Sequence, residues 1–267
     1  SAYSASLYAV AETIYENGAA SEPEENRDTI LSYLLNNILS KADGAKTPLA
    51  NTVRALQNDK KLTVGYLGGS ITNGYTAGYS VKEDGTVQNS GGNILLSYVN
   101  RTTDWLEKTY PDAQIESVNA GVSDTATNFG VYRLNDQLMN ENGHDMPDLV
   151  FVEFTSNDWV YDDCIKQSKK DIRRQIESLV RNIYEKNPYA DIVFVFTARS
   201  ENASSRPVYM EVAEECGIPT VDMGIAMQKK MNERGTANES SGSYYYTVDN
   251  LHPSTEGYGI YFEEIQK

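Results

Sequence analysis

Cysteine and histidine are scarce in this 267-residue chain, which contains two of each. Cys164 and Cys216 are too few for a disulfide framework or a structural zinc site; they either form one bridge or remain separate thiols. No set of His, Cys, Asp and Glu residues has a recognisable metal-binding spacing. We therefore expect neither a metal ion nor another cofactor.

Long apolar runs and positive charge are also lacking. No run approaches the roughly 20 apolar residues needed to span a bilayer, so we expect no membrane insertion. Lys and Arg total 23 against 38 Asp and Glu, and the formal net charge is -15. Such a surface repels nucleic-acid phosphates, anionic lipids and polyanionic substrates, so nucleic acid is not an expected partner and a neutral substrate fits better.

The length and composition suit one large α/β domain, or one domain with a small appendage. Hydrophobic residues make up 40% of the chain, enough to bury a sizeable core. The chain opens with Ser1 instead of methionine, which is compatible with a trimmed chain or a mature protein that has lost its signal peptide. We expect a secreted or cell-surface protein.

Strand-like and helix-like segments alternate along most of the chain. Five short apolar runs, rich in β-branched or aromatic residues, lie at residues 62–67, 115–118, 149–154, 192–196 and 218–221. Such nearly unbroken runs are typical of strands buried on both faces. Helical spacing occurs at residues 94–109, 132–139, 169–186, 207–216, 225–233 and 255–266. This alternation predicts an α/β fold with a parallel sheet covered on both faces.

The first 60 residues differ from the rest. Residues 5–15 and 28–39 have the pattern of amphipathic helices, separated by an acidic loop. We predict a helical extension at residues 1–60, packed on a main domain at residues 61–267. The last predicted helix reaches the end of the chain at Lys267, which leaves open a longer natural protein with further domains.

Four polar clusters follow predicted strands, at residues 68–74, 119–123, 155–159 and 249–253. Ligands bind outside the carboxyl ends of the strands in an open parallel sheet, so we expect these clusters to converge. Singly, each has an ordinary explanation: Ser70 could cap a helix, Asn157 could belong to a plain turn, and His252 could cap a loop. Phosphate binding at residues 68–74 is disfavoured because the spacing is neither that of a P-loop nor GxGxxG, and no lysine follows.

Together, the clusters contain the parts of nucleophilic serine chemistry, which needs a nucleophile, a base and a group that fixes the tautomer of the base. His144 lies in a polar loop before the third strand, at the wrong end of the sheet, and we interpret it as surface. His252 has Asp249 three residues before it, which in a tight turn can reach Nδ1 and leave Nε2 facing Ser70. We predict Ser70 as nucleophile, His252 as base and Asp249 as the orienting carboxylate.

An oxyanion that develops during this chemistry needs preorganised hydrogen-bond donors. We predict that the backbone N–H groups of Ser70 and Gly121 and the side-chain amide of Asn157 supply them. A glycine at position 121 would let the backbone approach a substrate without a Cβ in the way.

These residues resemble the SGNH hydrolases, also called GDSL esterases, which are named for a serine, a glycine, an asparagine and a histidine in four separate blocks. The first block, Gly-Asp-Ser-x-x-x-Gly, is similar to residues 68–74, and the glycine of the second matches Gly121. The third block, Gly-x-Asn-Asp, resembles residues 155–158, and the final Asp-x-x-His matches Asp249 and His252. The resemblance covers residues 61–267 with all four blocks in order.

Two positions depart from the family pattern: Gly69 replaces the aspartate of the first block, and Thr155 replaces the leading glycine of the third. Neither change removes a catalytic group. The resemblance implies a flavodoxin-like three-layer α/β/α sandwich with strand order 2-1-3-4-5. It also implies metal-independent ester hydrolysis through an acyl-enzyme.

Within this superfamily, the residues of the blocks are most similar to those of bacterial carbohydrate esterases. This resemblance implies a substrate with short acyl groups, acetyl above all, on a neutral carbohydrate. The aromatic residues Tyr75, Tyr79, Trp159 and Tyr246 stand near the blocks and could stack on sugar rings, or they could simply pack the loops. A lipase-like or thioesterase-like hydrolase, an acyltransferase and an inactive glycan-binding module on the same fold remain alternatives.

Overall fold

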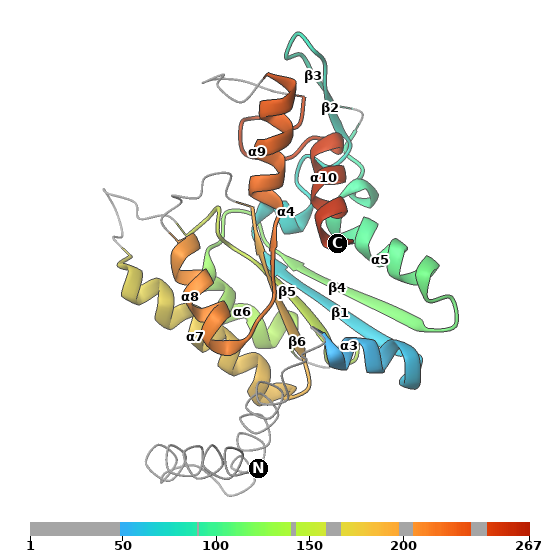
Figure 1. Cartoon of the computed structure of the whole chain (residues 1–267), viewed down its shortest axis with the longest axis vertical. Helices are drawn as coiled ribbons and strands as arrows, with labels where there is room; N and C mark the ends of the chain where they lie inside the picture. The colour runs from blue at the N-terminus through green and yellow to red at the C-terminus, as the bar shows by residue number, and fades with distance from the viewer. Residues whose placement is uncertain (1–48, 90, 140–142, 159–166, 198–204, 236–244) are drawn as a thin grey trace, which may run out of the picture.

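The computed structural model describes residues 49–89, 91–139, 143–158, 167–197, 205–235 and 245–267. Its centre is a five-stranded sheet in the order β4-β1-β5-β6-β7, with every neighbouring pair parallel (Figure 1). The strands span Lys61–Gly68 (β1), Gln114–Gly121 (β4), Leu149–Glu153 (β5), Asp191–Phe196 (β6) and Thr220–Asp222 (β7). Counted along the chain, this order is 2-1-3-4-5, and the predicted α/β fold is confirmed.

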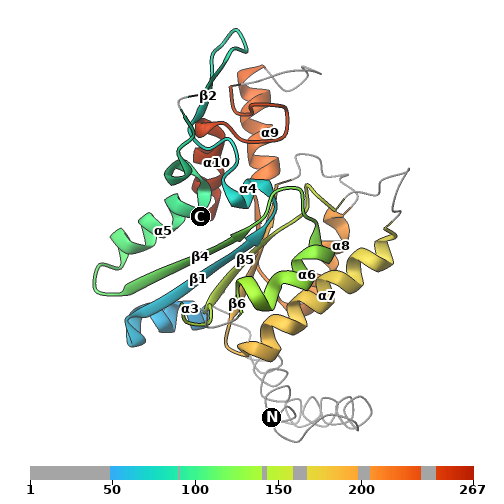
Figure 2. The same cartoon turned by 180° about the vertical axis from the view of Figure 1, so that it is seen from behind.

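Helices cover both faces of the sheet, which makes three layers (Figure 2). One face carries α6 (Thr127–Gln137), α7 (Lys169–Lys186) and α8 (Arg206–Cys216). The other carries α5 (Tyr98–Thr109), α9 (Met223–Arg234) and α10 (Thr255–Ile265). In the described part of the chain, no helix is both long and apolar enough to cross a membrane.

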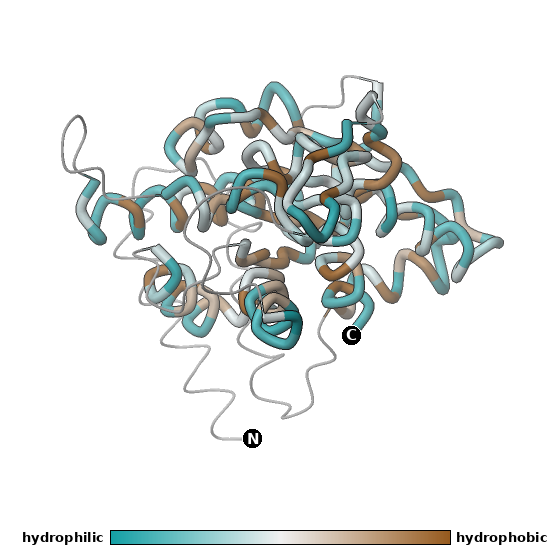
Figure 3. Tube along the Cα trace, turned by 90° about the horizontal axis from the view of Figure 1, so that it is seen from above, coloured by the Kyte–Doolittle hydropathy of each residue, from teal (hydrophilic) through white to brown (hydrophobic). Residues whose placement is uncertain are grey.

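Strand β6 shows why the core strands are apolar without a break. Ile192, Phe194 and Phe196 pack against the first helical layer, whereas Val193 and Val195 pack against the second. Because successive side chains point to opposite faces, a strand buried on both sides has no polar position to alternate with. Seen from above, hydrophobic and hydrophilic segments alternate along the flanking helices (Figure 3).

The helix predicted at residues 169–186 coincides with α7, which begins after Ser168. There, the Ser168 hydroxyl and the Asp171 carboxylate form a capping box. Helix α6 instead begins at Thr127, five residues before the predicted start at 132. The reason is tertiary: the carboxylate of Asp158 accepts the Thr127 N–H at 2.9 Å, a contact across 31 residues.

Three further elements were not predicted. The polar segment after the first block contains an antiparallel hairpin of β2 (Tyr79–Val81) and β3 (Val87–Asn89). Before the sheet, α3 (Ala50–Arg54) runs into a π-helical turn (Ala55–Asp59), and the Asp191 carboxylate accepts the Thr52 N–H at 2.7 Å and its hydroxyl at 2.8 Å. The predicted helices at residues 5–15 and 28–39 lie outside the described residues, so the domain division at 60 stays a prediction.

An apolar cavity of about 490 Å³ lies between α3, α5 and the strands β5–β7. Leu56, Trp105, Phe151 and Val193 are among its lining residues. Neither Ser70 nor His252 contributes to the lining, so this cavity is separate from the polar clusters that follow the strands.

Candidate active site

Ser70 stands at the end of β1, where it begins the four-residue helix α4 (Ser70–Asn73). The preceding residue, Gly69, occupies the cap position and has no side-chain hydrogen bond to the helix, so Ser70 does not act as the cap. Its hydroxyl oxygen instead lies 2.8 Å from His252 Nε2. Ser70 is 8% exposed, so its hydroxyl is largely shielded from bulk water.

His252 is oriented by the loop that precedes α10. Asp249 Oδ2 lies 2.7 Å from His252 Nδ1, and Asp249 Oδ1 accepts the backbone N–H of His252 at 2.7 Å and that of Leu251 at 3.1 Å. Asn250 turns the chain between them with a φ of 63°, a conformation that asparagine tolerates better than most residues. The structure thus joins Ser70, His252 and Asp249 in one chain of hydrogen bonds.

The Asp249 carboxyl is held in its charged form. Burial alone would raise its pKa, but the hydrogen bonds from the imidazole and backbone N–H of His252 outweigh burial and lower the pKa to about 2. The ionised carboxylate can accept a hydrogen bond from the Nδ1–H of the imidazole and stabilise an imidazolium.

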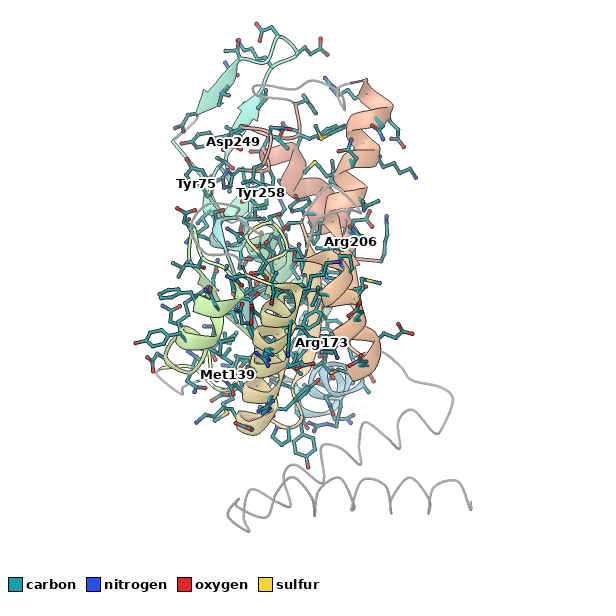
Figure 4. The ribbon with its side chains drawn as sticks, turned by 90° about the vertical axis from the view of Figure 1, so that its left-hand side faces the viewer. Tyr75, Met139, Arg173, Arg206, Asp249 and Tyr258 are labelled. Atoms are coloured by element: carbon teal, nitrogen blue, oxygen red, sulfur yellow. The ribbon has the colours of Figure 1, made fainter. Side chains whose placement is uncertain are left out.

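Two clamps join the serine turn to the histidine loop, which are 182 residues apart in the sequence. The Thr76 hydroxyl donates to the carbonyl of Pro253 at 2.9 Å. From α10, the Tyr258 hydroxyl contacts the carbonyls of Tyr75 at 2.8 Å and Ile71 at 3.2 Å. Figure 4 shows Tyr75, Asp249 and Tyr258 in the same region, near the end of the molecule that carries the β2–β3 hairpin.

Asn157 lies against the serine turn because residue 69 has no side chain. A Cβ at Gly69 would be 2.6 Å from Asn157 Oδ1. The family's aspartate at this position would therefore displace the asparagine in this structure. Among the described residues, none forms a hydrogen bond with the Asn157 side chain. Asp158, next in the chain, is buried and holds the N-terminus of α6 through Thr127.

Gly121 is needed for a different reason from the one expected. A Cβ there would lie 2.3 Å from Asn73 N and 2.6 Å from Thr72 C, so the glycine permits β4 to pack against α4, not against a substrate. Its N–H donates to Asn119 Oδ1 at 2.9 Å. To serve in an oxyanion hole as predicted, this N–H must either donate to Asn119 and the oxyanion at once or break its bond to Asn119.

Arg133 on α6 is a part of the site that sequence reasoning missed. Its buried guanidinium donates to the carbonyl of Gly68 at 2.8 Å and to that of Ala120, the residues before Gly69 and Gly121. Burial lowers the pKa of Arg133 to about 10, which still leaves it charged at neutral pH. A single arginine on a predicted helix carried no signal of this contact.

The remaining predicted residues are scattered. Tyr75 lies edge-on to the His252 ring, with centroids 4.7 Å apart, and is about half exposed. Tyr79 accepts a hydrogen bond from Asn89 within the β2–β3 hairpin, and Tyr246 packs partly buried against the core. His144 lies partly exposed in the loop before β5.

Two predicted positions, Trp159 and Cys164, lie outside the described residues, so the pairing of Cys164 with Cys216 stays open. Within the described ranges, no group of three or more His, Cys, Asp or Glu side chains could hold a metal ion.

A family model described as the GDSL-like lipase/acylhydrolase family matches residues 66–260. The chain belongs to this family. The resemblance inferred from the four blocks is therefore confirmed, and the family name denotes enzymes that cleave acyl esters. No curated protein sequence matches the chain.

Solved structures of similar fold include several ester hydrolases. A two-domain esterase active on acetylated mannans matches over 82% of this chain with a TM-score of 0.60 at 23% identity. This chain covers 52% of that protein, about half of its length. A lipase/acylhydrolase from Enterococcus faecalis matches over 76% of this chain and 93% of its own, with a TM-score of 0.53 at 21% identity.

An acetyl xylan esterase from Geobacillus stearothermophilus matches over 76% of this chain and 92% of its own, with a TM-score of 0.53 at 20% identity. At these levels of identity the similarity shows the GDSL hydrolase fold alone, because one fold hosts many substrates.

We predict that Gly121→Ala destabilises the protein and removes most of its activity, because the added methyl collides with the backbone of the helix that carries Ser70. Overpacking of this kind costs about 1–3 kcal/mol. Thermal denaturation and turnover of p-nitrophenyl acetate measure both effects.

The matched control is Gly259→Ala in α10, where the nearest atom to an added Cβ is Arg101 Nη1 at 3.6 Å. This change should leave activity intact and stabilise the helix by up to about 1 kcal/mol. Equal melting temperatures for the Gly121→Ala variant and the unchanged protein would contradict the packing argument.

Proposed function

We propose that this protein is a serine esterase that hydrolyses short acyl esters, acetyl esters in particular, carried by a neutral carbohydrate. The observation that carries the esterase proposal is the continuous hydrogen-bond chain from Asp249 through His252 to Ser70. A hydroxyl, an imidazole and a carboxylate in this order are the parts that nucleophilic serine catalysis requires.

In the proposed mechanism, His252 Nε2 takes the Ser70 proton while Oγ attacks the ester carbonyl. The resulting imidazolium is stabilised by the ionised Asp249. The oxyanion is received by the Ser70 N–H, which as the first of α4 has no intrahelical acceptor, and by the Asn157 amide. His252 then protonates the leaving alcohol, and the same imidazole activates a water that releases the acid from Ser70.

We predict that Ser70→Ala abolishes hydrolysis of p-nitrophenyl acetate, because no other group at the site can form the acyl-enzyme. The loss should be on the order of 10³-fold or more. A fluorophosphonate probe should label the unchanged protein and fail to label the variant.

Circular dichroism provides the control, since replacing a hydroxyl by hydrogen at this position leaves the fold intact. A folded variant with near-normal turnover would overturn the nucleophile assignment. An unchanged protein that is neither labelled nor active on any ester would instead point to an inactive binding module.

The carbohydrate part of the proposal is supported by charge and by exposed rings. The chain carries a net charge of -15, which disfavours anionic polymers. Tyr75 is half exposed beside His252, and an aromatic face at this position can stack on a sugar while limiting the space for an acyl chain. Similar folds include the esterase active on acetylated mannans and the acetyl xylan esterase described above.

We predict that kcat/KM falls in the order acetyl, butyryl, octanoyl for p-nitrophenyl esters. Acetate release should be faster from neutral acetylated glycans than from acidic ones, and added salt should narrow this difference by screening the repulsion. A preference for octanoyl esters, or no release from any acetylated glycan, would move the assignment to a lipase-like or thioesterase-like enzyme.

Phe129 and Tyr132 form a second exposed aromatic surface, on α6. They are 46% and 79% exposed, and their rings are nearly parallel, with centroids 5.9 Å apart and an interplanar angle of 25°. The helix starts at Thr127, whose N–H and hydroxyl bind the carboxylate of Asp158. Asp158 follows Asn157 in the chain, and Phe129 lies two residues after Thr127. Exposed rings that lie side by side can bind successive sugars of a glycan chain.

We predict that replacing both Phe129 and Tyr132 by alanine raises KM for an acetylated polysaccharide several-fold while leaving p-nitrophenyl acetate hydrolysis unchanged, because only the polymer reaches α6. Tyr189→Ala is the matched control: this tyrosine is 53% exposed and precedes the start of β6, whereas the candidate site lies beyond the carboxyl ends of the strands. If the two variants raise KM for the polysaccharide equally, or if neither raises it, the α6 pair has no specific role in binding.

A further inference from the structure

Glu153 is a fully buried acid directly beside the serine turn that the mechanism above does not use. It is the last residue of β5, and its relative exposure is 0%. No lysine, arginine or histidine among the described residues forms an ion pair with it. A buried carboxylate without a cation is costly unless hydrogen bonds compensate its charge.

The two carboxylate oxygens serve two different loops of the site. Oε2 accepts the Thr72 hydroxyl at 2.9 Å and the Gly69 N–H at 3.3 Å, both from the turn that carries Ser70. Oε1 accepts the Thr197 hydroxyl at 2.8 Å, at the end of β6. Thr197 contacts Ser156, the neighbour of Asn157, at 2.7 Å.

The directions of these bonds follow from the single proton on each hydroxyl. When Glu153 is ionised it can only accept, so Thr72 and Thr197 donate to it, the Tyr98 hydroxyl donates to Thr72, and Ser156 donates to Thr197. In this arrangement every donor points toward the carboxylate. A proton on Glu153 would oppose at least one of them and reverse the order of the hydroxyls behind it.

We infer that Glu153 is a positioning residue whose ionised carboxylate fixes the serine turn relative to the Asn157 loop, so that ester hydrolysis depends on the charge of Glu153. This inference rests on the proposed esterase function. It assigns Glu153 no contact with the substrate: the residue acts on Ser70 through Gly69 and Thr72, and on Asn157 through Thr197 and Ser156.

The charge of Glu153 changes within the working range of an enzyme. Burial raises its pKa to about 7, against the lowering effect of the hydrogen bonds from Thr197, Thr72 and Gly69. Burial also raises the pKa of three tyrosines whose charge would act on Glu153, so they stay neutral: Tyr98 on α5, Tyr209 on α8 and Tyr258 on α10. Arg133 of α6 reaches the same strand end through the Gly68 carbonyl. Two further carboxyls act on the same tyrosines as Glu153, Asp158 on Tyr209 and Asp249 on Tyr258.

The test is the pH dependence of kcat/KM for p-nitrophenyl acetate in the unchanged protein and in Glu153→Gln. Because full activity requires ionised Glu153, log(kcat/KM) of the unchanged protein should contain a step of about one unit, falling as the pH drops through about 7 and Glu153 gains a proton. In Glu153→Gln this step should be absent, and kcat should drop about tenfold with little change in KM, because the serine turn is displaced.

Stability provides a second readout with a defined sign. The folded pKa of Glu153 is above the ordinary value of 4.5, so its contribution to stability is complete at low pH and is lost as the pH rises through about 7. The melting temperature of the unchanged protein should therefore contain a decline between about pH 5 and pH 8 that the glutamine variant lacks.

Asp148→Asn is the matched control. This half-buried carboxyl lies just before β5, at the opposite end of the strand, accepts the Thr63 N–H at 2.9 Å and has a pKa that burial also raises. The variant should keep the one-unit step near pH 7 and the normal kcat, since Asp148 contacts no described part of the site.

Thr197→Val keeps the inference testable if Glu153→Gln does not fold. Removing the donor to Oε1 further raises the pKa of Glu153, so the one-unit step should move to higher pH, and Thr197→Ser should restore its position. An unchanged step and kcat in Glu153→Gln, or an unmoved step in Thr197→Val, would overturn the inference.

Failure of the proposed function looks different. In that case the unchanged protein shows no esterase activity, or Ser70→Ala retains it. An active protein that Ser70→Ala inactivates, but whose profile ignores Glu153, would refute the positioning role alone.

Discussion

The hydrogen bond between Ser70 and His252 is the contact on which the candidate site depends, and neither partner can hold it alone. Ser70 begins a helix of four residues, too short to be stable by itself, and His252 lies in a loop. The bond persists because the surrounding chain restrains both partners. Asp249 fixes the imidazole, while Thr76 binds the Pro253 carbonyl of the histidine loop and Tyr258 ties α10 to the serine turn.

The parallel sheet makes this restraint possible and also makes the site crowded. The ends of β1, β4 and β5 lie next to one another, so the turns that follow them compete for the same space. Gly69 and Gly121 relieve this competition, since a Cβ at either position would collide with Asn157 or with the backbone of α4. The fold thus requires glycine where a side chain would separate the groups of the site.

Two buried ionisable side chains, Arg133 and Glu153, also hold the turns of the site in place. Arg133 binds the carbonyl oxygens that end β1 and β4, whereas Glu153 binds donors from the serine turn and from β6. Burial disfavours the charge of both groups, which lowers the pKa of Arg133 and raises that of Glu153. Retaining such groups reduces stability, and we attribute their presence to the geometry that they impose on the site.

The sequence alone predicted the α/β class, the strand order through the family resemblance, and the polar clusters behind the strands. These features are local or periodic: an unbroken apolar run indicates a strand buried on both faces, and Asp249 lies only three residues before His252. The start of α6 at Thr127 was missed because its determinant, Asp158, is 31 residues away. The β2–β3 hairpin was missed because its strands are short and polar.

The tertiary structure decided which hydrogen bonds the polar clusters form with one another and with the rest of the chain. Only the packed chain shows that the Gly121 N–H is bound by Asn119, that Arg133 reaches two strand ends, and that Glu153 joins two loops. The bonds of Arg133 to the strand ends and of Glu153 to the two loops span 13 to 84 residues and leave no periodic trace in a sequence. Their geometry depends on strand register and helix packing, which the whole chain determines together.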